Sequence, residues 1–281
     1  MKISRRRFIQ LLSAFLYNAN LRGMGEGKIY KGSGKGICVP GLNCYSCPGA
    51  VASCPLGSLQ TALTNIGSKW PLYIIGTLML FGILFGRAIC AFLCPFGLIQ
   101  ELLYKIPSPK INKNRWTRRL SWLKYGILLV FVILLPIITL MQDKVAVPAF
   151  CKFICPAGTL EGGIPLALLN ENIRNIIGPL FNWKVFLLVV ILAAAVFIYR
   201  FFCRFLCPLG AIYSLFNRYA LFGITVDEGK CTKCKSCVRS CKLDVYYIND
   251  RECIRCGECQ KSCHFDAVSH CFNKKQTGKE V

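Results

Sequence analysis

The cysteines near the end of the chain are spaced like the ligands of iron-sulfur clusters. Two runs of four follow each other: Cys231, Cys234, Cys237 and Cys241, then Cys253, Cys256, Cys259 and Cys263. In such tandem runs, three closely spaced thiolates hold three corners of a cubane, and the fourth ligand comes from the other run. The sequence therefore predicts two 4Fe-4S clusters, one on Cys231, Cys234, Cys237 and Cys263, and one on Cys253, Cys256, Cys259 and Cys241.

Two details of these runs bear on the kind of metal site. Lys242 and His264 follow the fourth cysteines, where proline is usual; this changes the turn but removes no ligand. Structural zinc is the alternative, because Cys-x2-Cys pairs also bind zinc. The tandem three-plus-one spacing favours iron-sulfur clusters.

A second pattern is the tetrapeptide Cys-Pro-x-Gly, which occurs four times. The copies begin at Cys54, Cys94, Cys155 and Cys207, and three have another cysteine four residues earlier, at Cys90, Cys151 and Cys203. On a helix, that spacing places both sulfurs on one face. The proline suits the first turn of a following helix, whose free N–H groups attract an anion. Each of these three copies therefore predicts a ligand pair at a helix end, although small buried cysteines that only pack are the alternative.

Apolar segments predict a membrane protein. Residues 71–89, 125–142 and 184–202 are long enough to cross a bilayer, and residues 8–24 form a fourth segment that polar side chains dilute. The expected fold is an all-α polytopic membrane domain over residues 1–222, with about four transmembrane helices and short interfacial or re-entrant helices. A small α+β two-cluster ferredoxin-like domain is expected over residues 223–281.

The charge distribution predicts the orientation of these segments. The net charge is +22, and much of the excess lies beside apolar segments, so the chain is not expected to bind nucleic acid. Basic residues fill the loop between the second and third segments, namely Lys105, Lys110, Lys113, Arg115, Arg118 and Arg119. Basic loops stay in the cytoplasm. We therefore expect a multi-pass protein of the cell membrane with both termini cytoplasmic; Arg5, Arg6 and Arg7 act as an anchor, with a twin-arginine signal as the alternative.

This orientation pairs the membrane cysteines. The cytoplasmic ends of two segments carry Cys90, Cys94, Cys203 and Cys207, which are expected to form an inner site. On the outer side, Cys151 and Cys155 are expected to be completed by Cys47 and Cys54, with Cys38 and Cys44 as alternatives. One or two further clusters in the membrane domain follow, whereas Cys271 stays unpaired.

No other chemistry is predicted from the sequence. The two histidines, His264 and His270, offer no paired ligands for a transmembrane haem. No arrangement of a nucleophile with a base stands out, so no catalytic residue is expected. An electron-transfer subunit of an oxidoreductase system is favoured over a stand-alone enzyme.

The chain resembles the NapH/NosR-type membrane polyferredoxins. The resemblance rests on Cys90-Ala-Phe-Leu-Cys94-Pro and Cys203-Arg-Phe-Leu-Cys207-Pro, on the four apolar segments and on the two-cluster tail. It implies a membrane-bound protein that relays electrons between a cytoplasmic or quinol donor and a redox partner across the membrane.

The outer cysteines depart from that family's quinol-oxidising member. They make a ferredoxin or flavoprotein at least as suitable a partner as quinol, and they leave the direction of electron flow open. The alternative function is an assembly, maturation or redox-sensing factor for a metalloenzyme, which rests on family analogy alone.

Overall fold

The computed structural model describes residues 5–63, 72–143 and 147–272. Within these ranges the chain is mostly helical, and its sheet has two strands. The helical character of the expected fold is thus confirmed.

The helices of the first part alternate between long apolar stretches and short turns. Its first half contains α1 (Arg5–Tyr17), α2 (Leu21–Glu26), the 3-10 turn η1 (Ser33–Gly36), α3 (Pro55–Leu63), α4 (Leu72–Leu84), α5 (Ala88–Phe92) and α6 (Pro95–Leu103). Its second half contains α7 (Arg115–Leu120), α8 (Leu123–Ile127), the π-helical η2 (Leu128–Leu134), α9 (Leu135–Asp143), α10 (Ala149–Phe153), the π-helical η3 (Gly158–Gly163), α11 (Ile164–Leu169), α12 (Glu171–Ile176), α13 (Pro179–Phe197), α14 (Phe201–Phe205) and α15 (Pro208–Phe216).

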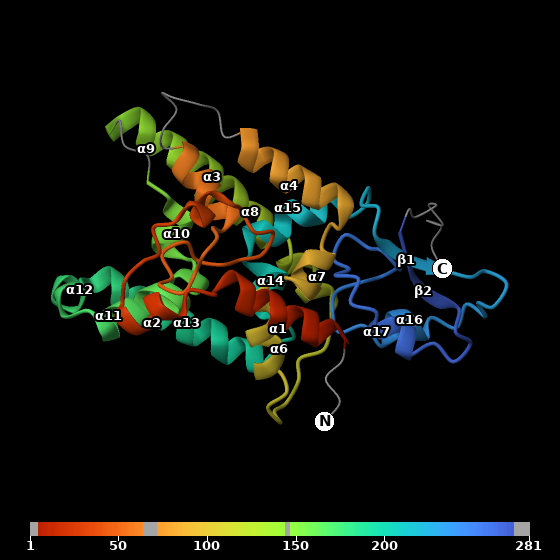
Figure 1. The fold of residues 1–281 in the computed structure, drawn as a ribbon. Helices are drawn as coiled ribbons and strands as arrows, with labels where there is room; N and C mark the ends of the chain where they lie inside the picture. Colours follow the sequence, from red (N-terminus) through yellow and green to blue (C-terminus); the bar gives the residue numbers. More distant parts are fainter. Residues whose placement is uncertain (1–4, 64–71, 144–146, 273–281) are drawn as a thin grey trace.

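Up to residue 272, where the described part of the tail ends, the tail contains two strands and two short helices. They are β1 (Gly223–Val226), α16 (Ser236–Arg239), α17 (Glu258–Lys261) and β2 (Val268–Cys271). The strands are antiparallel, and Gly223 pairs with Cys271 while Val226 pairs with Val268. In Figure 1 these elements lie at one end of the helical bundle, near the start of α1.

Among the described residues, two helices are long and apolar enough to cross a membrane. They are the continuous run Arg115–Gln142, built from α7, α8, η2 and α9, and α13, with 28 and 19 residues. Only 22% and 17% of their most apolar windows is buried, whereas a core helix of a soluble protein would be mostly buried. Their exposed apolar faces suit lipid, and they correspond to the segments expected at 125–142 and 184–202, although α13 already ends at Phe197.

The other two expected spans are shorter in the structure. Helix α1 ends at Tyr17, and α2 starts afresh at Leu21 with Asn20 as its cap, so residues 8–24 do not form one helix. Helix α4 has 13 residues, about 20 Å at the usual rise, and residue 71 of the expected segment lies outside the described residues. Four complete spans are therefore not confirmed.

Helix α1 nevertheless has the polarity of a lipid-facing helix. Its buried positions are Arg6, Gln10 and Ser13. Phe8 and Phe15 point outward and are 59% and 58% exposed. In a soluble helix the apolar face would be inside; the reversed arrangement fits a helix whose polar face lines the interior of a membrane bundle.

The helices form two groups that enclose the cysteine-bearing segments. Helices α3, α4, α8, α9 and α15 lie together on one side, and α1, α6 and α13 lie on the other (Figure 1). The short helices α5 and α14 end just before Cys94 and Cys207. Both cysteines are therefore held at junctions between two helices.

A buried carboxylate joins three distant segments of the bundle. Glu101 accepts hydrogen bonds from Arg6 at 2.7 and 2.8 Å, from Arg200 at 2.7 and 2.9 Å and from the Tyr199 hydroxyl at 2.7 Å. Burial by itself raises the pKa of Glu101, but the charges of Arg200 and Arg6 and their hydrogen bonds lower it to about 2. Glu101 is therefore an anion that holds α1 and the start of α14 against α6.

A second buried carboxylate joins the tail to the bundle. Glu252 pairs with Arg87 and accepts from Lys124 at 2.5 and 2.7 Å. Asp244 accepts two hydrogen bonds from Arg204, both at 2.5 Å. Because all of these groups are buried, separating the tail from the bundle would break these ion pairs and leave buried charges without a partner.

We expect Glu252→Ala to lower the free energy of unfolding by about 3–5 kcal/mol, because it leaves two buried cations without a counter-charge. Denaturant titration of the holo-protein in detergent measures this. The control is Glu26→Ala, which removes an exposed pair with Arg22 and should leave the free energy of unfolding nearly unchanged. Equal losses in the two variants would contradict the role assigned to Glu252.

Candidate functional site

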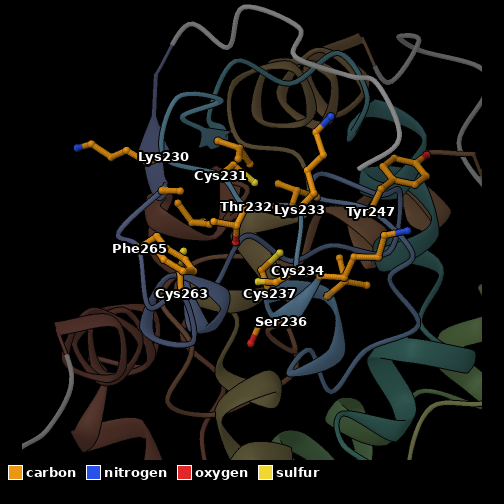
Figure 2. Close-up of a pocket in the computed structure, with 16 residues that line it drawn as sticks. Lys230, Cys231, Thr232, Lys233, Cys234, Ser236, Cys237, Tyr247, Cys263 and Phe265 are labelled. Atoms are coloured by element: carbon orange, nitrogen blue, oxygen red, sulfur yellow. The ribbon is translucent and has the colours of Figure 1, made fainter.

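The first tail set surrounds one small cavity. Cys231, Cys234, Cys237 and Cys263 line a cavity of about 30 Å³ (Figure 2). The loop bends around them because Lys233 and Lys235 have left-handed backbone angles, with φ of 54° and 58°. Lysine rarely adopts this conformation without compensating contacts. The structure thus brings together the four cysteines that the spacing assigned to one cluster.

The second tail set lines a larger cavity. Cys241, Cys253, Cys256 and Cys259 are among the residues that line this cavity, which has a volume of about 340 Å³. Burial, and after it the nearby thiols of Cys253, Cys256 and Cys241, raises the pKa of Cys259 to about 12. Arg255 repeats the left-handed conformation of the first loop, with φ of 52°, and its N–H donates to Cys253 Sγ at 3.4 Å.

Four cysteines converge inside the bundle. Burial is the main cause that raises the pKa of Cys207 well above its usual value, and the nearby thiols of Cys203, Cys90 and Cys94 raise it further. All four residues are buried. They lie at two junctions between helices. In one junction the second helix begins at Pro95, and in the other it begins at Pro208. We call this set, Cys90, Cys94, Cys203 and Cys207, the inner site.

The inner site is braced by two arginines that sequence reasoning missed. Arg200 donates to the Cys90 carbonyl at 2.5 Å, and Arg87 donates to the Cys203 carbonyl at 3.2 Å. Each arginine precedes the first cysteine of its own pair by three residues and binds the opposite pair. This common offset, Arg-x2-Cys-x3-Cys-Pro, was the sequence signal that could have revealed them.

A further set of cysteines gathers around Cys155. Burial, and after it the thiols of Cys151, Cys44 and Cys54, raises the pKa of Cys155 well above its usual value. A Cβ atom placed on Gly158 would lie 3.8 Å from both Cys155 Sγ and Cys44 Sγ, so both sulfurs lie beside this glycine. We call Cys44, Cys54, Cys151 and Cys155 the outer site.

The remaining cysteines of this region lie around the outer site. The Cys47 N–H donates to the Cys44 carbonyl at 3.1 Å. The Cys38 N–H donates to the Tyr73 hydroxyl at 3.4 Å, and Cys38 pairs with Ser53 in an isolated bridge. The structure therefore favours Cys44, one of the two alternatives, where Cys47 was the first choice.

The residues present fit iron-sulfur clusters. Among the described residues, no three cysteine, histidine, aspartate or glutamate side chains converge as ligands of a single ion. A cubane needs a wider cage, because its own iron and sulfide atoms fill the space between four thiolates. Buried thiols with a raised pKa stay neutral unless a metal replaces the proton. Arginines at the inner site would then offset the anionic charge.

Cysteine sets at helix junctions, followed by tandem cysteine runs, define a ferredoxin-type membrane protein, and the comparisons agree. The family described as a 4Fe-4S binding domain matches residues 70–114, 126–164 and 181–224. The chain is an iron-sulfur electron-transfer protein related to NosR, NirI and MauN, so the resemblance to the NapH/NosR type is confirmed.

Individual relatives match only part of their own length. An uncharacterized protein of Methanocaldococcus jannaschii is 28% identical over 66% of this chain and 69% of its own. The methylamine utilization ferredoxin-type protein MauN of Methylobacillus flagellatus is 25% identical over 60% of this chain and 53% of its own. The regulatory protein NosR of Pseudomonas aeruginosa is 28% identical over 66% of this chain and 25% of its own. No solved structure matches.

We expect Cys207→Ser to remove one cluster, about four iron atoms per chain, and to leave the tail clusters intact because the ligand sets share no cysteine. Iron and sulfide analysis with EPR measures this. The control is Cys271→Ser, which lies in none of the sets and should keep all iron. Loss of every cluster signal in Cys207→Ser would contradict the assignment.

The outer ligand choice has its own test. We expect Cys44→Ser to remove the outer cluster, because Cys44 lies with Cys54, Cys151 and Cys155, and we expect Cys47→Ser to retain it. Comparing the iron content and EPR signals of these two variants decides between neighbouring cysteines. The reverse result would restore Cys47 as the ligand.

Proposed function

We propose that this protein is a membrane-bound relay that carries electrons between a cytoplasmic donor and a redox partner on the other side of the membrane. Residues 1–222 would form the membrane domain and residues 223–281 a cytoplasmic two-cluster domain. Two clusters would lie in the tail, one at the inner site and one at the outer site. Each transfer oxidises the donor by one electron and reduces the acceptor by one, and no bond in the chain forms or breaks.

The observation that carries this proposal is that the four cysteine sets follow one another. Cys237 lines both tail cavities. From the second tail set, Cys256 is close enough to the guanidinium of Arg200 to feel its charge, and Arg200 binds the Cys90 carbonyl. The tail is therefore docked directly against the inner site.

A tyrosine connects the inner and outer sites. Burial, and after it the thiols of Cys90, Cys54 and Cys94, raises the pKa of Tyr213 well above its usual value. Its hydroxyl donates to the Pro40 carbonyl at 2.9 Å. Tyr213 thus lies within reach of cysteines from both sets, which supports a continuous path through the bundle.

The membrane location is supported by the exposed apolar faces. Helix α4 exposes Leu72, Tyr73 and Leu80, as the two long helices expose much of their own surface. We propose that α1 and α4 join the two long helices in the cell membrane, with both chain termini in the cytoplasm. The basic loop between α6 and the run Arg115–Gln142 supports this orientation.

The surroundings of the first tail set favour an acidic protein as donor. Lys230, Lys233 and Lys235 are among the residues that line its cavity, and Figure 2 shows Lys230 and Lys233 beside the cysteines. A positive rim speeds the approach of a negatively charged partner. A reduced ferredoxin or flavoprotein would meet this set first, and quinol is the competing donor.

Reconstitution in liposomes tests the relay. With the tail facing outward, we expect a reduced ferredoxin outside to reduce a membrane-impermeant dye enclosed inside, and we expect higher salt to slow this reaction. Cys207→Ser is the matched control and should stop the transfer while the tail clusters still accept electrons. No dye reduction through the fully loaded protein would refute the relay, and reduction of the clusters by quinol alone would make quinol the donor.

A further inference from the structure

In each copy of the Cys-Pro-x-Gly motif, the residue six positions after the cysteine carries a polar group. Its neighbours in the sequence are mostly apolar. These residues are Gln60, Gln100, Glu161 and Tyr213. Gln60, Gln100 and Tyr213 are fully buried. A buried polar side chain is costly unless it is hydrogen-bonded, so a polar group at the same offset in all four copies calls for a common role.

Gln100 shows this role at the inner site. Its Oε1 accepts a hydrogen bond from the Phe202 N–H at 2.9 Å, and its Nε2 donates to Cys203 Sγ at 3.0 Å. One side chain therefore fixes the backbone just before a cysteine and also contacts the sulfur of that cysteine. The cysteine belongs to a different copy of the repeat, about a hundred residues away.

Gln60 occupies the matching place at the outer site. Its Oε1 accepts from the Cys151 N–H at 3.4 Å. Its Nε2 is buried and has no hydrogen-bond partner among the described residues. A buried amide donor without an acceptor is expensive, and the equivalent atom of Gln100 donates to a thiol sulfur.

Glu161 continues the pattern in a third copy. Its Oε2 accepts from the Cys44 N–H at 2.8 Å. When ionised, a carboxylate can accept but not donate, so in that form Glu161 fixes the backbone of a cysteine without donating to its sulfur. The two glutamines carry both an acceptor and a donor whatever the pH.

We propose that Gln60 and Gln100 are positioning residues that each fix one cysteine of a cluster and donate an amide hydrogen bond to sulfur there, Gln100 to Cys203 and Gln60 at the outer site. This rests on the proposed function, because it requires clusters at both sites. A donor to sulfur stabilises the more negative, reduced cluster and so raises the reduction potential. The glutamines would keep both membrane clusters reducible inside an apolar bundle.

EPR-monitored redox titration of the purified holo-protein tests this. Gln100→Leu should shift the reduction equilibrium of the inner cluster about tenfold toward the oxidised form, equivalent to 59 mV for one electron, and leave the outer cluster unchanged. Gln60→Leu should do the reverse. The signals are assigned by their loss in Cys207→Ser and Cys155→Ser.

The matched control is Gln10→Leu. Gln10 is equally buried and donates at 3.0 Å to the carbonyl of Cys94, not to a sulfur. Its replacement should therefore shift the reduction potentials of the inner and outer clusters by less than the tenfold effect expected for the other two glutamines. Retained clusters with unchanged potentials in both glutamine variants would overturn the inference and leave the relay proposal standing.

A second variant covers the case in which Gln100→Leu loses its cluster. Gln100→Glu keeps an acceptor for the Phe202 N–H and, as a carboxylate, cannot donate to sulfur, so it should retain the cluster with a lowered potential. An unchanged potential in that variant would overturn the inference. Absence of any cluster from the wild-type membrane domain would overturn the proposed function, and this inference with it.

Discussion

Burying charged side chains in an apolar bundle is unfavourable unless they are paired. In this protein two buried carboxylates, Glu101 and Glu252, provide that pairing. Glu101 and Glu252 each receive two cations from segments that are far apart in the chain. A buried ion pair is strongly destabilising when one partner is missing, so these segments must assemble in a single arrangement. Arg87 and Arg200, which the carboxylates hold, also bind the carbonyls of the opposite cysteine pairs. The geometry of the inner site thus depends on the two carboxylates.

The repeated cysteine motif can be understood as a unit for holding an anion away from water. A cluster with four thiolates carries about two negative charges, which need nearby donors or cations in apolar surroundings. Helices α6 and α15 begin at the motif prolines, so their first N–H groups face the cysteines, and the Gly210 N–H donates to Cys207 Sγ at 3.4 Å. Arginine and glutamine side chains add to this set. The tail sites, which lie nearer water, rely on backbone loops with left-handed residues.

The first predicted membrane segment differs from the structure in its extent and in the direction of its side chains. Gln10 and Ser13 weakened the first apolar segment, because mean hydropathy does not register which way a side chain points. In the structure these residues face the interior and Phe8 faces outward. The break between α1 and α2 could not be read from the apolar run either, since Asn20 ends it by capping the second helix. The sequence could not rank Cys44 against Cys47, because both lie in a loop without periodic geometry.

The sequence by itself indicated the iron-sulfur character of the protein, and it predicted the ligand pairs of the repeats and the ligand sets of the two tail runs. These depend on cysteines within a few residues of each other, whose relative positions follow from local helix and turn geometry. Only the tertiary structure decided that Arg6 and Arg200 share Glu101, that Arg87 and Arg200 each bind the opposite cysteine pair, and that Gln60 reaches Cys151. Those contacts join residues about a hundred positions apart, and they are selected by packing and by the need to pair every buried charge, which no local pattern encodes.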